Sequence, residues 1–229
     1  LTLVLPKQNT VPDLATSGLD TVAIRMPSHP VARELLKEAG IPLAAPSANP
    51  FGRLSPTRAE HVAADFDSGI AIILDGGPCE VGVESTVVGW EEGKLRILRA
   101  GGIAMEAIEE ALRRPVSVKT GTSILSPGNL PSHYAPRTPL VLLGAEKADV
   151  SPTAGLLWFG VKKPPEGFAL TENLSATGDP REAATNLFAA LHRLDEAGLS
   201  RIYVRLLPEK GLGRAINDRL RKAAAHTSG

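Results

Sequence analysis

A stretch rich in proline, glycine and serine interrupts the middle of the chain and most constrains how the chain can fold. Residues 115–139, PVSVKTGTSILSPGNLPSHYAPRTP, carry no sustained hydrophobic period, whereas strand and helix patterns alternate on both sides. A segment of this length without regular structure is typical of a domain connection or a functional lid. The sequence therefore predicts two α/β units, over 1–114 and 140–229, joined by a linker over 115–139.

The first unit alternates short apolar runs with amphipathic ones. The apolar stripe of residues 28–40, with Ser28 as N-cap and Gly40 as stop, predicts a helix. Ser55 followed by Pro56 predicts the start of a second helix over 55–69, and residues 102–114 predict a third. Runs rich in β-branched residues predict strands. They are LTLVLP, TVAIRMP, IPLAAP, IAIILDGG, ESTVVGW and KLRILRAGG.

The second unit repeats this alternation. Residues 179–198 carry the clearest helix signal, because Asp179 can cap the helix, Pro180 suits its first turn and Glu182 completes a box-like start. A final helix is predicted from GRAINDRLRKAAA, and strands from LVLLGA, AGLLWFG and RIYVRLLP. Alternation of this kind predicts a small parallel α/β layer.

Composition excludes several classes of function. The 25 Lys and Arg residues balance 25 Asp and Glu residues, which argues against a protein that coats nucleic acid or an acidic membrane. Cys79 is the only cysteine, so no intramolecular disulfide can form, and we expect a cytoplasmic protein. The five histidines lack zinc-like spacing, so no metal site is predicted. No apolar run is long enough to span a membrane, so no membrane partner is predicted.

The polar stretch APSANPFGRLSPT, residues 45–57, has two interpretations. The prolines at 46 and 50 favour extended backbone before them, so Ser47 and Asn49 would project to one side. They would lie past the end of a strand, where open α/β sheets bind ligands. Alternatively, this is a loop whose Ser and Asn side chains bond local backbone groups. The pattern alone favours the second interpretation.

Three arginines in predicted strands are candidates for binding an anion. Arg99 ends a strand beside two glycines, and its planar guanidinium suits phosphate. The position is equally compatible with an arginine that faces solvent or forms an ion pair with a carboxylate. Arg96 lies three residues earlier and faces the opposite side, so at most one of the two faces a ligand. Arg25 lies within an apolar run, and a buried arginine needs an anionic partner, either a structural carboxylate or a substrate.

Five motifs, in this order, resemble the Sua5/YrdC family of threonylcarbamoyl-AMP synthases. They are TVAIRMP, APSANPFGRLSPT, VESTVVGW, LRILRAGG and SPGNLPSHYAPRTPL. SHYAPRTPL is specific to the two-domain Sua5 form, and the tail GLGRAINDRLRKAA is similar to the end of its second domain. The resemblance covers essentially the whole chain. It implies a YrdC-like twisted open sheet with helices, N-terminally incomplete, plus a small Rossmann-like α/β C-terminal domain.

The resemblance also implies a reaction. The amine of L-threonine takes up CO2 from bicarbonate as a carbamate, which attacks the α-phosphate of ATP to give threonylcarbamoyl-AMP and pyrophosphate. Mg²⁺ is expected with the ATP. A downstream transferase complex then passes the threonylcarbamoyl group to an adenosine of tRNA, giving t6A, so tRNA is an indirect partner. Such a nucleotidyl transfer needs positioning and positive charge, and no catalytic side chain is predicted.

Site residues follow from the same resemblance. Arg25 matches the arginine that holds the threonine carboxylate, and Ser85 matches a hydroxyl near the threonine. His133 and Tyr134 match the linker stretch that folds over the nucleotide, with simple packing of the linker as the alternative. Ala45 could contribute only its backbone. The residues that match positions around ATP or the adenylate are Thr21, Ala45, Ser47, Asn49, Ser55, Arg99, His133 and Tyr134.

One departure and two alternatives accompany this hypothesis. The family's first domain begins with a Lys-x-Arg basic motif, and no such segment precedes Leu1, so we expect that part of the pocket wall is absent from this chain. A non-catalytic RNA-binding or regulatory module is the main alternative, although a solvated helix surface explains its basic residues more simply. A carbamoyltransferase lacks support, because such proteins carry zinc-finger-like cysteines. The basic residues are Lys210, Arg214, Arg219, Arg221 and Lys222.

Overall fold

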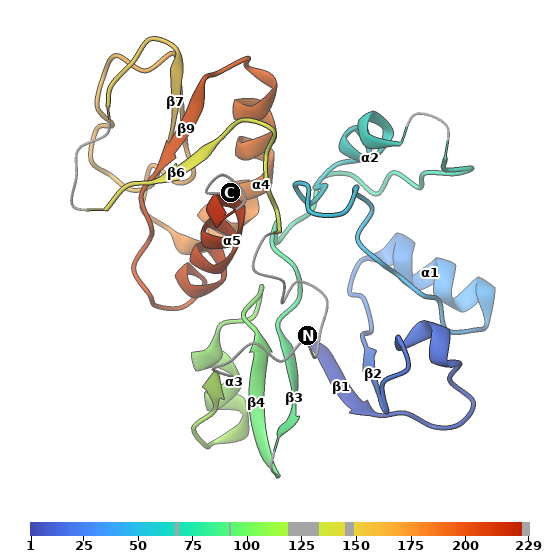
Figure 1. The fold of residues 1–229 in the computed structure, drawn as a ribbon. Coiled ribbons are helices and arrows are strands. Elements are labelled where there is room, and N and C mark those ends of the chain that lie inside the picture. The colour runs from blue at the N-terminus through green and yellow to red at the C-terminus, as the bar shows by residue number, and fades with distance from the viewer. Residues whose placement is uncertain (67–68, 92, 119–132, 145–148, 226–229) are drawn as a thin grey trace.

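Two separate β-sheets organise the computed structural model of the chain, which describes residues 1–66, 69–91, 93–118, 133–144 and 149–225. Figure 1 shows the sheets as two bodies, the first formed by the blue and green part of the chain and the second by the yellow to red part. The predicted α/β class is confirmed. Residues 119–132 of the predicted linker lie outside the described residues, and the boundaries at 114 and 139 stay a prediction.

The first sheet has five strands in the order β2-β1-β3-β4-β5. The pairs β1–β2 and β3–β4 are antiparallel, and the pairs β1–β3 and β4–β5 are parallel. The helix α3 packs on one face, where Ile108 meets Val88 and Ile97. The strands are β1 (Thr2–Pro6), β2 (Thr21–Ile24), β3 (Val87–Glu91), β4 (Lys94–Arg99) and β5 (Ser117–Val118), and the helices are η1 (Asp13–Ala15), α1 (Pro30–Ala39), α2 (Ala59–Asp65) and α3 (Met105–Leu112).

The second sheet has four strands, all parallel, in the order β6-β9-β7-β8. The predicted parallel layer is therefore confirmed. Its main core lies between the sheet and two helices, because side chains of both helices and of the strands share one buried cluster. The elements are β6 (Leu140–Leu142), β7 (Ala154–Trp158), β8 (Leu170–Asn173), β9 (Arg201–Val204), α4 (Pro180–Glu196) and α5 (Gly213–Ala225).

Local signals placed α4 correctly. The Asp179 carboxylate accepts a hydrogen bond from the Arg181 backbone N–H at 2.8 Å, so it caps the helix as predicted. The Glu182 carboxylate does not complete a capping box; it accepts hydrogen bonds from the hydroxyls of Ser175 and Thr177 instead. The helix buries seven side chains, which explains why it is long and regular.

Two predicted strands and two predicted helix starts are wrong. IPLAAP, residues 41–46, and IAIILDGG, residues 70–77, pair with no neighbouring strand among the described residues and are largely exposed. Strand formation needs a hydrogen-bonded neighbour, which an apolar pattern alone does not supply. His29, not Ser28, precedes α1, and α2 begins four residues after Ser55. Gly40 does end α1, in a left-handed conformation with φ 64°.

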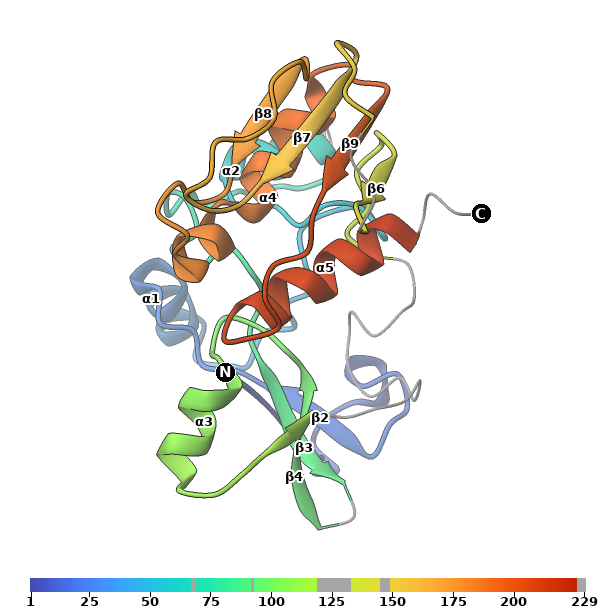
Figure 2. The same cartoon turned by 90° about the vertical axis from the view of Figure 1, so that its left-hand side faces the viewer.

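Figures 1 and 2 both show α5 lying between the two sheets, so this helix belongs to the second unit but faces the first. By contrast, α1 buries no side chain, and its predicted apolar stripe is open to solvent at Val31 and Leu35. No helix within the described ranges is both long and apolar enough to cross a bilayer. Both α5 and α4 contact the first unit, for example through Arg219 to Glu84 and through Thr185 to the Glu80 carbonyl.

Candidate functional site

One end of the first sheet gathers hydroxyl and guanidinium groups, and we call it the Ser85 end. Ser85 comes two residues before β3, and Arg99 ends β4, which runs antiparallel to β3. Arg99 Nη2 donates a hydrogen bond to the Ser85 carbonyl at 2.9 Å. The hydroxyls of Thr2 and Ser85 lie 2.6 Å apart. Strand pairing thus brings Thr2 of β1, Arg99 of β4 and Ser85, just before β3, to one place. The ligand contacts expected of Ser85 and Arg99 stay a prediction.

Arg25 lies at the same end but is not buried. Leu3 pairs with Ile24, so the residue after β2 is level with the first residue of β1. The strand ends at Ile24, however, and Arg25 is exposed, so the expected burial in an apolar strand is wrong. Its charge still reaches the site: burial most strongly, and then the positive charges of Arg219 and Arg25, lower the pKa of Arg99.

Thr21 lies at the opposite end of the sheet. It pairs with Pro6, at the far end of β1 from Thr2. Four residues of extended strand span about 13 Å, because each adds roughly 3.3 Å. The structure therefore separates Thr21 from the Ser85 end. The resemblance had implied that Thr21 and Arg99, which lies at the Ser85 end, line the same nucleotide pocket.

The proline-rich stretch of residues 45–57 divides into two parts. Ala45 and Ser47 are exposed, whereas Asn49 is buried. The Asn49 amide donates hydrogen bonds to the carbonyls of Pro50 at 3.2 Å and Arg53 at 3.0 Å. The second interpretation, in which a polar side chain bonds local backbone, therefore holds for Asn49, and Asn49 does not share an exposed face with Ser47.

Ser55 connects this stretch to the Ser85 end. Its hydroxyl is buried and donates a 2.6 Å hydrogen bond to Glu84 Oε1. Glu84 is the residue directly before Ser85, so the hydrogen bond holds residues 55 and 84–85 together. Ser55 was predicted both to bind the adenylate and to start a helix, and the structure places it in this network instead of in a cap.

His133 and Tyr134 lie between the proline-rich stretch and the second unit. The Tyr134 ring is only 2 % exposed and packs 5.7 Å from the Phe188 ring of α4. The next residue, Ala135, donates its backbone N–H to the Gly52 carbonyl at 2.8 Å. Burial lowers the pKa of His133 and raises that of Tyr134. Tyr134 therefore packs the linker against the second unit, as the alternative interpretation expected. Its contact with a nucleotide stays a prediction.

Three residues at this site were missed by the sequence reasoning: Thr2, Glu84 and Arg219. Arg219 was considered only as part of a basic helix surface, and that is wrong, because its side chain is fully buried and paired with Glu84. The other basic residues of this helix that were predicted to face solvent are paired with carboxylates. The pairs are Arg214–Glu106, Arg221–Glu209 and Lys222–Asp218. One sequence signal could have revealed the burial of Arg219: at helical spacing its neighbours include the apolar residues Ala215, Ile216 and Ala223.

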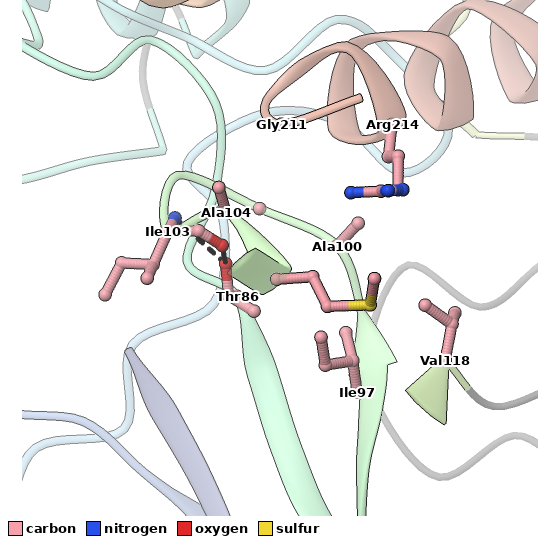
Figure 3. A pocket seen from close by; sticks show the side chains of 10 residues that line it. Thr86, Ile97, Ala100, Ile103, Ala104, Val118, Gly211 and Arg214 are labelled. Atoms are coloured by element: carbon pink, nitrogen blue, oxygen red, sulfur yellow. Dashed lines mark hydrogen bonds between the residues drawn. The ribbon is translucent and has the colours of Figure 1, made fainter. Parts of the chain in front are cut away.

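A separate small pocket lies behind the Ser85 end, under the start of α5. Figure 3 shows its apolar wall of Ile97, Ala100 and Val118, with Arg214 reaching toward it from α5. The Thr86 hydroxyl also lines the pocket and donates a hydrogen bond to the Ile103 carbonyl at 2.7 Å. The lining contains none of the predicted site residues, so this pocket is not the candidate site.

Comparison with known proteins decides the family. Residues 1–101 match a family described as telomere recombination (Sua5_yciO_yrdC), and residues 103–225 match the threonylcarbamoyl-AMP synthase C-terminal domain. The chain belongs to the Sua5/YrdC family. The predicted family is thereby confirmed, including the second domain specific to the Sua5 form.

Curated members of the Sua5/YrdC family match nearly the whole chain. Threonylcarbamoyl-AMP synthases from Pyrococcus abyssi and Bacillus subtilis are 38% and 40% identical over 99% and 98% of this chain. These alignments cover 70% and 69% of the two relatives. A crystal structure of P. abyssi Sua5 complexed with L-threonine matches with a TM-score of 0.86 at 36% identity, covering 99% of this chain and 70% of that one.

A histidine pair lies at the contact between the two units. His61 of α2 stacks on His192 of α4, with ring centroids 3.9 Å apart. His61 Nδ1 accepts the Thr57 backbone N–H at 3.1 Å, which requires that nitrogen to be unprotonated. Burial first, and then the charge of His192, lower the pKa of His61.

We predict that acid weakens this contact. The unfolded chain takes up a proton at His61 near pH 6.5, while the folded chain resists it. The stabilisation is therefore complete above about pH 6.5 and is lost as the pH falls below it. Thermal unfolding between pH 7.5 and 5.5 should show a steeper loss in the parent than in His61→Asn, which keeps an acceptor for Thr57. Equal slopes would contradict the prediction.

Proposed function

We propose that this protein binds L-threonine at the Ser85 end and takes part in ATP-dependent synthesis of threonylcarbamoyl-AMP. The observation that carries the proposal is the Arg99–Ser85–Thr2 cluster, found in a chain that matches named threonylcarbamoyl-AMP synthases over nearly its whole length. A related Sua5 protein has been crystallised with L-threonine. An anion-binding end of this kind suits both a carboxylate and a phosphate.

The residues of this chain would act by binding and orientation. In our proposal Arg25 pairs with the threonine carboxylate and Ser85 contacts the same substrate. Arg99 adds positive charge where pyrophosphate leaves, which stabilises negative charge developing on the phosphates. The attacking carbamate oxygen, the α-phosphorus and the leaving pyrophosphate oxygen need only be held in line, because alignment of reactants alone accounts for a large part of such rate enhancements.

The remaining nucleotide contacts stay proposals as well. Ser47 and the Ala45 backbone are exposed and free to meet an adenylate, and His133 lies close to Phe51, at 6.0 Å between ring centroids. Asn49 and Ser55 would act through the shape of the loop, since their side chains are engaged within the protein. Thr21 stays a proposed contact at the strand end opposite Ser85.

Magnesium fits this site as part of the nucleotide. Within the described residues, no three His, Cys, Asp or Glu side chains gather to hold a metal ion. The carboxylate nearest to the cluster, Glu84, is engaged by Arg219 and Ser55. Mg²⁺ commonly enters an active site on substrate phosphates, so we propose that it arrives with ATP and supplies charge neutralisation there.

We propose the same wider setting that the resemblance implies. Bicarbonate supplies the carbamate carbon, a downstream transferase complex consumes the adenylate, and tRNA is the final acceptor in t6A formation, within the cytoplasm. The RNA-binding alternative is disfavoured, because three of its basic residues are ion-paired and a fourth is buried.

Threonine-dependent release of pyrophosphate tests the function. The complete natural protein containing this sequence is incubated with ATP, bicarbonate and Mg²⁺, with and without L-threonine, and pyrophosphate is quantified. We expect release only when threonine and bicarbonate are both present. A correctly folded protein that releases no pyrophosphate in response to threonine would refute the proposal. The chain of residues 1–229 assayed in parallel shows how much of the activity it supports by itself.

Replacing Ser47 by alanine tests the nucleotide-facing part of the proline-rich stretch. Ser47 is exposed, so its loss should change the free energy of unfolding by no more than about 0.5 kcal/mol. We expect ATP affinity to fall about 3- to 10-fold, the effect of one lost hydrogen bond. Thermal stability with and without ATP measures both. An unchanged ATP-induced shift would remove Ser47 from the site.

A further inference from the structure

Arg219 brings the second unit into direct contact with the Ser85 end. It lies on α5, and its side chain is fully buried. Its Nε donates a hydrogen bond to Glu84 Oε2 at 2.8 Å, and its Nη1 donates to the Ala100 carbonyl. Its guanidinium also lies 5.4 Å from the centre of the Tyr134 ring. One side chain of the C-terminal helix therefore contacts three different segments around the site.

Glu84 connects Arg219 to two candidate binding residues, Ser55 and Ser85. Its second oxygen, Oε1, accepts the Ser55 hydroxyl at 2.6 Å, so both carboxylate oxygens are used. Burial alone would raise the pKa of Glu84, but Arg219, the Ser55 hydroxyl and Arg99 together hold that pKa below its ordinary value. Glu84 thus stays ionised and is held at two points.

The segments held by this ion pair are those that carry the proposed ligand contacts. Ser85 follows Glu84 directly, and Arg99 precedes Ala100 directly. Arg99 in turn donates to the Ser85 carbonyl, so two arginines hold residues 84–85, Arg219 at the Glu84 carboxylate and Arg99 at the Ser85 backbone. Moving Glu84 would move the Ser85 carbonyl and hydroxyl relative to Arg99.

We propose that Arg219 and Glu84 are positioning residues for substrate binding, so that docking of the second unit sets the geometry of the Ser85 end. This inference rests on the proposed function. It explains why a charged pair is buried here: such pairs stabilise folds little compared with apolar side chains of similar volume, but they fix one arrangement of their neighbours. A merely structural role for the pair predicts effects on stability alone.

The test removes both charges together, because removing one would leave the other buried and unpaired. Glu84→Met with Arg219→Met in the complete natural protein should remain folded, with a thermal midpoint close to that of the parent. We expect the KM for threonine to rise at least 10-fold, with a smaller change in kcat. The dissociation constant for threonine, measured by calorimetry without ATP, should rise equally. Arg219→Lys, which keeps the charge but loses the planar fork, should give an intermediate KM.

The same helix supplies a matched control. Arg214 of α5 pairs with Glu106 of α3 at 2.6 Å, also between the two units, but this pair is partly exposed and contacts no proposed ligand residue. Arg214→Met with Glu106→Met should leave both the KM and the dissociation constant for threonine unchanged.

The outcomes separate the two proposals. A parent that neither binds threonine nor releases pyrophosphate in response to it refutes the proposed function, and this inference with it. If the parent is active and the Glu84/Arg219 double variant binds threonine like the parent, only the positioning role is overturned. Equal losses in the control pair would also overturn it, because general loosening of the contact would then suffice. If the double variant fails to fold, the Arg219→Lys variant decides between the outcomes. A folded Arg219→Lys protein that binds threonine as tightly as the parent overturns the proposal.

Discussion

Replacing Arg99 by methionine should lower kcat/KM for threonine-dependent pyrophosphate release by about 100-fold. The guanidinium donates to the Ser85 carbonyl at 2.9 Å and lies within 3.4 Å of its hydroxyl. Its loss removes two hydrogen bonds from a charged donor to Ser85, and the positive charge that we propose acts on the phosphates. Each such charged hydrogen bond contributes about 1.5–3 kcal/mol, and one missing electrostatic stabiliser of a transition state costs about 10²–10³ in rate.

Arg96→Met is the matched control for Arg99. Arg96 lies on the same strand, but its guanidinium donates to the Ser117 hydroxyl of β5, away from Ser85. We expect its kcat/KM to stay within about twofold of the parent. Comparable losses in both variants would show that the strand tolerates neither substitution and would remove Arg99 from the proposed machinery. Thermal midpoints of both variants establish that the compared proteins are folded.

Replacing Tyr134 by alanine should lower the free energy of unfolding by about 3–5 kcal/mol, the usual cost of deleting a buried aromatic ring. The ring centre lies 5.7 Å from that of Phe188, 5.4 Å from the Arg219 guanidinium carbon and 4.1 Å from the ring centre of His133. Tyr134 also adopts a left-handed backbone with φ 62°, which is unfavourable for a bulky residue and persists only because packing holds it.

Tyr134→Phe separates packing from the hydroxyl. It keeps the ring and should cost less than about 1.5 kcal/mol. Urea unfolding of both variants, followed by circular dichroism, gives the two free energies. An alanine variant within 1 kcal/mol of the parent would mean that the ring contributes little to joining the linker to the second unit.

Local patterns explain which elements could be predicted. Gly40 and Asp179 mark helix ends because a left-handed residue and a side-chain cap act within one turn of the backbone they satisfy. Residues 41–46 and 70–77 have the apolar content of strands, but within the described residues no neighbouring strand pairs with them, and apolar content does not report whether such a partner exists. The strand β8 was missed for the converse reason, since Leu170–Asn173 has little apolar content and relies on pairing with β7.

The sequence by itself determined the α/β class, the parallel second sheet, most helices and the family. Only the tertiary structure showed that Arg99 contacts Ser85 at one sheet end. Only the tertiary structure decided that Arg25 is exposed, that Thr21 lies at the other end, and that Tyr134 belongs to a core. It also revealed the contacts of Glu84 with Ser55 and Arg219, which span 29 and 135 residues of chain. Hydrogen bonds and ion pairs of that separation leave no periodic trace in a sequence, because they depend on how whole elements pack rather than on local backbone preference.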